Sequence, residues 1–207
     1  DAYWMVRLRA AEYQSMVDAL DWLAAIEPSM TSSPLRTRWV AKQHSLQAAK
    51  LAAQAAMIES QNDLAKLLGQ GPLAPWPLPT TEPNRGNYRS DQATPAPQSP
   101  SAGTLQRLGA VLASLARAFP AEASAVVEAD LQRAATSAAL AEGHATADEA
   151  LQSLATQLDL TRALLRDLYH YNRLVAYHAI VGDQGVSTDE LLQRMTGRAA
   201  PTATLGM

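Results

Sequence analysis

The sequence predicts an all-α protein made of long antiparallel helical hairpins, of the coiled-coil or α-barrel type, joined by a proline-rich linker. Hydrophobic residues make up 47% of the 207 residues, whereas aromatic residues make up only 5%. Ala and Leu supply the excess, which is typical of helices that pack closely through small side chains. Long segments without Pro or Gly carry apolar residues at helical spacing. This composition argues against an all-β sandwich, which needs β-branched and aromatic residues in short runs.

The first hairpin is predicted over residues 1–69. Residues 2–27 form its first helix, and a break containing Pro and Ser follows. Ser33 then caps a second helix with Pro34 at its first position, where a missing N–H costs least. This helix continues without Pro or Gly to Gly69, which suits the left-handed conformation at a helix end.

Residues 70–103 are predicted to form an extended linker. Eight of the twelve prolines lie between Pro72 and Pro100, and prolines at this density exclude a helix or a central strand. The start of the linker favours a polyproline-like conformation. Trp76 and Tyr88 are the candidates for pinning it to a neighbouring surface, with an exposed Trp as the equal alternative.

The second hairpin is predicted over residues 104–182. Its first helix is expected to kink or restart at Pro120 and to reach the Glu142-Gly143 pair. Thr146 and Glu149 then have the spacing of a capping box, which starts a helix that continues to Gly182. Residues 183–207 are expected to form a short helix, which begins at a second capping box, followed by a frayed tail.

The last long helix carries two apolar stripes, which indicates partners on two sides, as in a bundle centre or a closed ring of helices. The alternative is an isolated four-helix bundle whose central residues face inward. The first stripe holds Leu151, Leu154, Leu158, Leu165, Leu168, Val175 and Ala179, and the second holds Leu160, Leu164, Tyr171, Leu174 and Val181. The preceding hairpin has a similar Ala-rich seam, formed by Leu35, Trp39, Leu46, Ala49, Ala53 and Ala56.

One stretch of the second hairpin has a recognisable order of residues. Gly143 is followed by Thr146 three positions on, Glu149 six on and Leu151 eight on, and the helix then carries the pair Tyr171-Asn172 before the glycine stop at Gly182. The first hairpin closes similarly, with an Ala-rich helix that ends in Leu67-Leu68-Gly69. Together these segments resemble the coiled-coil hairpins of TolC-like outer-membrane efflux proteins.

The resemblance implies a transport component that works in efflux or type I secretion. It implies a homotrimeric conduit with a periplasmic helical barrel, fed by an inner-membrane pump through a periplasmic adaptor, and a location at the cell outer membrane and periplasm. Gly143, Thr146, Glu149 and Leu151 would then be hairpin-tip contacts to a partner. Packing between helices would involve Leu160, Leu164, Tyr171, Asn172 and Leu174.

The linker departs from that family pattern. TolC-like chains carry paired transmembrane strands of about ten alternating residues each, and residues 70–103 do not alternate in this way. We therefore expect either a fragment or a strand-poor relative, which meets the outer membrane through segments not present in this sequence. The chain also begins at Asp1 without a basic segment or an apolar core of a signal peptide, as expected of a mature or truncated piece.

Composition and motifs argue against other functions. The net charge of −3 without a basic face excludes broad nucleic-acid binding, and no run approaches the ~18 consecutive apolar residues of a membrane-spanning helix. No cysteine, Gly-x-Ser-x-Gly elbow or phosphate-binding glycine loop occurs. Asp167 and His170 share a helix face, but no second such motif lies nearby to complete a metal site. We expect no enzyme activity, metal or cofactor.

A different class of function remains open. The same helices suit a non-conducting periplasmic coiled-coil scaffold or adaptor that binds a partner through one hairpin tip. The polar aromatic cluster at Tyr169, Tyr171, Asn172 and Tyr177 could fix the register of neighbouring helices, or it could lie at the edge of a core with its hydroxyls in water.

Overall fold

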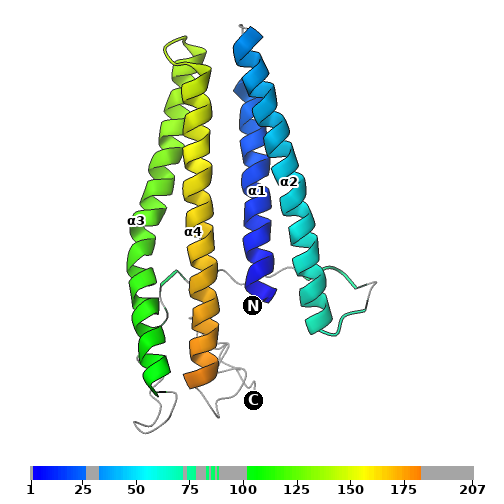
Figure 1. Ribbon diagram of the computed structural model, residues 1–207, viewed down its shortest axis with the longest axis vertical. Helices are drawn as coiled ribbons and strands as arrows, with labels where there is room; N and C mark the ends of the chain where they lie inside the picture. Colours follow the sequence, from blue (N-terminus) through cyan, green and yellow to red (C-terminus); the bar gives the residue numbers. More distant parts are fainter. Residues whose placement is uncertain are drawn as a thin grey trace, which may run out of the picture. The chain divides into compact units, whose positions relative to one another are not determined.

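The protein is all-helical. The structure, a computed structural model, describes residues 2–26, 33–71, 74–77, 83, 85, 86, 88 and 102–182. Four helices follow one another in these ranges and no strand occurs in them (Figure 1). They are α1 (Ala2–Ile26), α2 (Ser33–Leu67), α3 (Ala102–Ala141) and α4 (Ala147–Gly182). The all-α prediction is confirmed.

The helices end at Gly or Pro residues of the sequence or shortly before them. α1 and α2 run side by side in opposite directions, and α2 ends just before Gly69, whose φ is +65°. α3 is one continuous helix through Pro120, so the expected restart does not occur. The predicted break after α1, most of the linker and the predicted terminal helix of residues 183–207 lie outside the described residues.

Packing divides the chain into two compact units that differ from the predicted domain plan. Unit 1 contains Asp1–Pro79 and Pro120–Arg166, and unit 2 contains Thr80–Phe119 and Asp167–Met207. Each of α3 and α4 therefore contributes one half to each unit. The prediction separated the two hairpins, whereas backbone contacts divide the second hairpin along its length, and the half next to the α3–α4 turn packs with α1 and α2.

Unit 1 has a core formed by three helices. From Met16 to Ile26, α1 supplies four buried residues at intervals of three, four and three, as expected of one buried helix face. α2 and α4 complete the cluster, and Leu140 of α3 packs against its edge. The cluster consists of Met16, Ala19, Leu23, Ile26, Trp39, Leu46, Leu154 and Leu158. The seam predicted for α2 is therefore correct at Trp39 and Leu46, which are 0% and 3% exposed.

Trp22 connects α1 to two other helices. Its ring lies 6.0 Å from that of Trp39 on α2. Its indole Nε1–H donates a 2.9 Å hydrogen bond to Ser137 on α3, and the Arg133 guanidinium lies 5.4 Å from the ring centroid. The half-buried indole ring contributes a large apolar contact area, and the hydrogen bond of its N–H and the cation over its face fix the orientation of the ring. Trp22 therefore fixes how α1, α2 and the second half of α3 pack.

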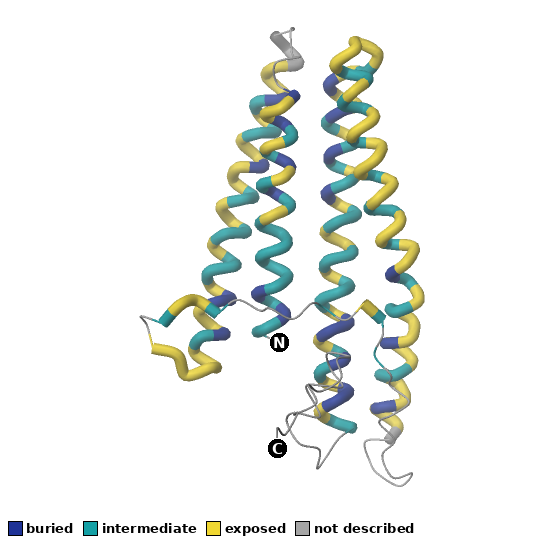
Figure 2. The backbone as a smooth tube through the Cα atoms, turned by 180° about the vertical axis from the view of Figure 1, so that it is seen from behind, coloured by how far each residue is buried: buried dark blue, intermediate teal, exposed yellow. Residues whose placement is uncertain are grey.

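Burial is uneven around the helices. Buried residues follow the inner faces, whereas long stretches of α2 and α3 are exposed (Figure 2). Leu67 on α2 is 75% exposed, although it belongs to the same helix as the buried Leu46. These two leucines give a matched pair for testing the core.

We expect Leu46→Ala to lower the free energy of unfolding by about 2–5 kcal/mol, because it removes a fully packed side chain and leaves a cavity. Leu67→Ala should change it by less than about 0.5 kcal/mol, as surface substitutions usually do. Urea unfolding followed by circular dichroism measures both. Equal effects of the two substitutions would show that the described core is not the stabilising one.

Candidate functional site

The α3–α4 turn has the geometry that the sequence predicts for a hairpin tip. Gly143 has a φ of +76°, which favours glycine. The backbone N–H of His144 donates to the Ala139 carbonyl at 2.7 Å, and that of Gly143 donates to the Leu140 carbonyl at 3.1 Å. This pair of bonds is the Schellman arrangement, which satisfies carbonyls at the end of a helix. The turn therefore stops α3 sharply.

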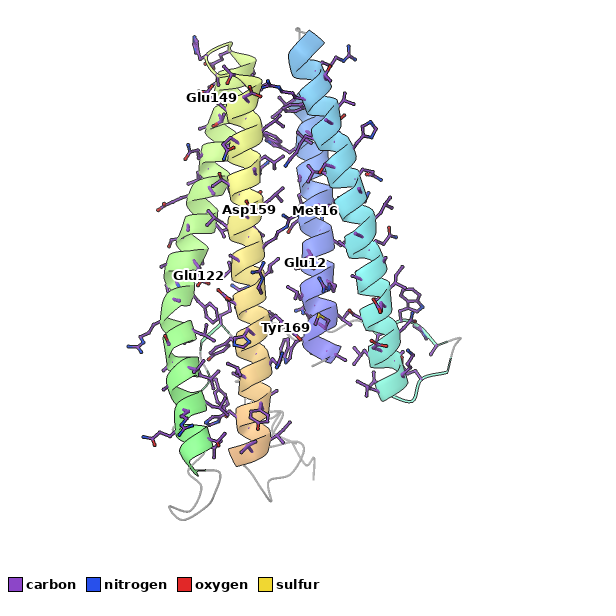
Figure 3. The ribbon with its side chains drawn as sticks, in the orientation of Figure 1. Glu12, Met16, Glu122, Glu149, Asp159 and Tyr169 are labelled. Atoms are coloured by element: carbon purple, nitrogen blue, oxygen red, sulfur yellow. The ribbon has the colours of Figure 1, made fainter. Side chains whose placement is uncertain are left out.

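The start of α4 forms the expected capping box. The backbone N–H of Thr146 donates to the Glu149 carboxylate at 2.7 Å, and the backbone N–H of Glu149 donates to the Thr146 hydroxyl oxygen at 3.2 Å. The Thr146 hydroxyl also donates to that carboxylate at 2.8 Å. Figure 3 shows Glu149 beside the turn. Both residues are exposed, so the box organises the tip without closing it to solvent.

The hydrogen bonds of the box favour the charged carboxylate. The backbone of Thr146, and then its hydroxyl, lower the pKa of Glu149 below its ordinary 4.5, while desolvation opposes them weakly. A lowered pKa stabilises the fold above pH 4.5, and this contribution disappears as the pH falls through the folded-state pKa.

The four predicted tip residues do not all face solvent. Gly143, Thr146 and Glu149 are exposed, whereas Leu151 is half-buried and packs against the core cluster of unit 1. Beside the tip, Arg38 at the start of α2 forms a 2.7 Å ion pair with Asp148. Both side chains are more than half exposed, so the pair contributes little stability. It does show that the start of α2 is level with the tip.

An open groove runs between α3 and α4 next to the tip, with a volume of about 680 Å³. Its walls are mostly small and hydroxyl-bearing side chains, and Glu149 and His144 mark its tip end. Residues that line it include Ala129, Ala135, Thr136, Ala139, Ser153 and Thr156. The groove therefore offers few large or charged side chains that could hold a ligand.

The predicted inter-helix residues divide between the two units. Leu160 and Leu164 belong to unit 1, and Leu174 belongs to unit 2; all three are half-buried. Tyr171 and Asn172, also in unit 2, are each 1% exposed. The structure therefore does not bring the five residues together as one site.

Tyr171 sits in an aromatic cluster of unit 2. Its ring lies edge-on to Phe119 of α3, with centroids 5.2 Å apart. Burial raises the pKa of Tyr171 above 10.0, and a hydrogen bond with the Tyr88 backbone opposes this rise. The fold therefore favours the neutral phenol of Tyr171, even at the pH values at which an ordinary tyrosine loses its proton.

Tyr88 pins one point of the linker to this cluster, as the sequence suggested. Its hydroxyl lies 3.0 Å from Nδ1 of the buried His178, and the two rings meet edge-on at 5.5 Å. Trp76, the other proposed anchor, is 49% exposed. Sequence reasoning did not identify His178 as the partner, because only the fold brings residues 90 positions apart into contact.

A second contact of the linker lies beside Pro120. Gly86 has a φ of +101°, and a Cβ atom there would lie 3.0 Å from Cβ of Ala116. Pro120 has no N–H to donate to the Ala116 carbonyl, so α3 lacks one backbone hydrogen bond at this point. Only glycine allows the linker backbone to approach the helix so closely here.

A row of exposed apolar residues lies on α3, and sequence reasoning did not single it out. Val127 is 58% exposed and Leu131 is 64% exposed. Together with three exposed alanines they follow a spacing of four, three, four and three residues, which is the heptad pattern of a coiled-coil seam. We call Val127, Leu131, Ala134, Ala138 and Ala141 the α3 stripe.

α3 is also the most apolar long helix of the described residues. Among the described residues, the segment Gly103–Ala141 is the only helix long and apolar enough to cross a membrane, and 11% of its most apolar window is buried. Charged and polar residues interrupt this segment, so it contains no run of ~18 consecutive apolar residues, and it meets the criterion by length and composition alone. Soluble core helices pass the same test, but they are mostly buried.

Within the described ranges, no group of three or more His, Asp or Glu side chains is placed to hold a metal ion.

No protein-family model, curated protein or solved structure matches this chain.

Thr146→Ala should lower the free energy of unfolding by about 1 kcal/mol at pH 7, the usual effect of losing an N-cap. The deficit should shrink at pH 3, because the bond between hydroxyl and carboxylate that lowers the pKa of Glu149 is then being lost in the native protein too. Urea unfolding at both pH values measures this. Thr156→Ala, an exposed Thr on the same helix, is the control; an equal deficit at both pH values would contradict the assignment.

Tyr88→Phe should lower the free energy of unfolding by about 1 kcal/mol, because it removes the hydroxyl that meets His178. Tyr88→Ala should cost more, since it also removes the ring contact. Trp76→Ala is the matched control, an aromatic residue of the same linker that is half exposed. If Tyr88→Ala and Trp76→Ala have the same effect in urea unfolding, the linker is not anchored at Tyr88.

Proposed function

We propose that this chain is the helical, periplasmic portion of a TolC-like export or efflux component, which self-associates around a conduit. The exposed α3 stripe is the observation that carries the proposal. The order of residues from Gly143 to Gly182 resembles that family, and this resemblance is the reason for proposing export or efflux in particular. The function is non-enzymatic transport and needs no cofactor.

The α3 stripe favours self-association on energetic grounds. Fully burying an exposed Val or Leu side chain contributes about 1.5–3 kcal/mol, and the stripe has one of each, which are 58% and 64% exposed. Its alanines let a second helix axis approach closely. Contiguous apolar surface of this kind marks an interaction site more often than a free surface.

The dimensions of the helices suit a conduit. α3 has 40 residues and α4 has 36, which corresponds to lengths of roughly 50–60 Å at 1.5 Å per residue. Several copies with such helices side by side would enclose a passage of that length. A homotrimer is the assembly that the family resemblance suggests, with a periplasmic adaptor at the hairpin tips, an inner-membrane pump beyond it and a location at the outer membrane and periplasm.

The tip geometry supports a docking role at one end. The Schellman turn and the capping box hold Gly143, Thr146 and Glu149 in a defined, exposed arrangement. A rigid tip needs little ordering when it binds, which lowers the entropic cost of association. The same feature would serve the rival function, a non-conducting coiled-coil scaffold or adaptor.

Light scattering coupled to size-exclusion chromatography tests the proposal. The native chain should elute at a multiple of 22.2 kDa, and Leu131→Asp should reduce the mass to that of a monomer, because a charge cannot be buried in an apolar seam without a partner. Leu67→Asp, at an even more exposed leucine of α2, is the control and should leave the assembly intact.

The possible outcomes separate the two functions. A soluble monomer of the native chain that still binds a partner through its tip would favour the scaffold. A native chain that requires detergent would instead assign α3 to the membrane. An assembly that Leu131→Asp leaves unchanged would contradict the role of the α3 stripe.

A further inference from the structure

The open groove beside the α3–α4 turn has room for several side chains, and we call it the tip groove. Its volume of about 680 Å³ lies within the range of about 300–1,000 Å³ that is usual for binding clefts. Ala129, Ala135 and Ala139 form much of its α3 wall, and Ser153 and Thr156 belong to its α4 wall. Because these side chains are small, the tip groove is a hollow that larger side chains can enter.

Hydroxyl groups in the tip groove are already paired within their own helices. The Thr136 hydroxyl donates to the Gln132 carbonyl at 2.8 Å, and the Ser153 hydroxyl donates to the Ala150 carbonyl at 2.8 Å. Burying a polar group costs little when its hydrogen bond is kept. Apolar side chains can therefore cover these two hydroxyls without leaving an unpaired donor.

α3 carries the tip groove and the α3 stripe on different faces. The groove wall uses residues at intervals of three, four and three, namely Ala129, Gln132, Thr136 and Ala139. The α3 stripe begins two residues earlier, at Val127, and repeats at four, three, four and three. With about 3.6 residues per turn, the two rows lie on roughly opposite faces of the helix. One α3 therefore presents projecting side chains on one face and helps to form a hollow on the other.

The two surfaces also match along their length. His144 and Glu149 lie at the end of the tip groove nearest the turn, and its other lining residues among those described are neutral. In the α3 stripe, the large side chains of Val127 and Leu131 are farthest from the turn, and the alanines are nearest to it. At equal height, the large apolar side chains would meet the neutral part of the groove, and only alanines would come near its charges. Such a contact leaves no charge buried under a large apolar side chain.

We infer that the α3 stripe of one copy docks in the tip groove of the next copy. Val127 and Leu131, which are 58% and 64% exposed, supply large side chains, and the small side chains of the groove leave room for them. The α3 helices of neighbouring copies then run parallel to each other. The inference rests on the proposed function, and it specifies the surface that receives the α3 stripe.

This contact favours a closed ring. It joins two different surfaces of the chain, so a free stripe and a free groove remain at the ends of the assembly until a ring closes. The stripe spans residues 127–141 and the groove wall spans residues 129–139 of the same helix. A rotation about an axis parallel to α3 brings them together without a shift along that axis. A contact of this kind closes instead of growing into a helical filament.

Filling the tip groove tests the inference. Ala135 is exposed and lines the groove, so Ala135→Trp should occupy the space that the next copy needs and leave the core undisturbed. We expect light scattering to give the monomer mass of 22.2 kDa at a concentration at which the unmodified chain is assembled. Ala52→Trp, at an exposed alanine of α2 outside the groove, is the matched control and should keep the assembled mass. An Ala135→Trp chain that stays assembled would overturn the inference.

Cysteine crosslinking identifies the two surfaces directly, because the chain contains no cysteine of its own. Ala134→Cys in the α3 stripe and Ser153→Cys in the tip groove are made in separate full-length chains with different tags, co-expressed and mildly oxidised. A disulfide forms only where the Cα atoms come within about 7 Å. We expect a disulfide-linked pair of the two tagged chains on a non-reducing gel.

Gln47→Cys, at an exposed position of α2, is the control partner and should give no link with Ala134→Cys. A link between two Ala134→Cys chains, with none to Ser153→Cys, would overturn the inference in favour of a symmetric α3–α3 contact. Circular dichroism of each variant verifies that the helices are intact.

The mass of the unmodified chain distinguishes a failure of this inference from a failure of the proposed function. An oligomer without the link between positions 134 and 153 would overturn this inference and leave the proposed function standing. A monomer at every concentration would overturn both. An oligomer that carries the link supports both.

Discussion

The indole of Trp22 is the contact on which unit 1 depends, because it meets side chains from two other helices at once. It lies against Trp39 of α2, donates its N–H to Ser137 of α3 and receives the Arg133 guanidinium over its ring. Each of these contacts is modest alone. Together they orient three helices around a core to which α4 adds Leu154 and Leu158.

That arrangement determines which surfaces remain free. With the inner faces of α1, α2 and α4 committed to the core, the apolar positions on the outer faces of α2 and α3 have no partner within the described residues. A single chain thus satisfies one face of each helix and leaves another in water. The proposed assembly of several chains through the α3 stripe would account for an Ala-rich composition that a small isolated bundle does not require.

The parts of the fold that depend on local chemistry could be predicted from the sequence. Gly143 favours a helix end, and the Thr146–Glu149 pair forms a capping box at a helix start. The sequence therefore predicted the C-terminal end of α3 and the start of α4 correctly. Long-range contacts could not be predicted, since nothing near Tyr88 specifies His178 and nothing near Trp22 specifies Ser137. The α3 stripe could not be predicted from the sequence, because most of its residues are alanines. Alanine occurs on buried and on exposed helix faces, so only the observed burial shows which face of α3 is exposed. The TolC-like export function and its partners are still predictions.

The central proposal is that the exposed α3 stripe of one chain is covered by other copies of the same chain. Native mass spectrometry of the unmodified chain, taken over a range of concentrations, tests it most directly. The account predicts one discrete oligomer, a trimer if the conduit is built as proposed, with few intermediates because a ring is stable only when it closes. A chain that stays monomeric at every concentration, or a ladder of ever larger species without a preferred size, would contradict it.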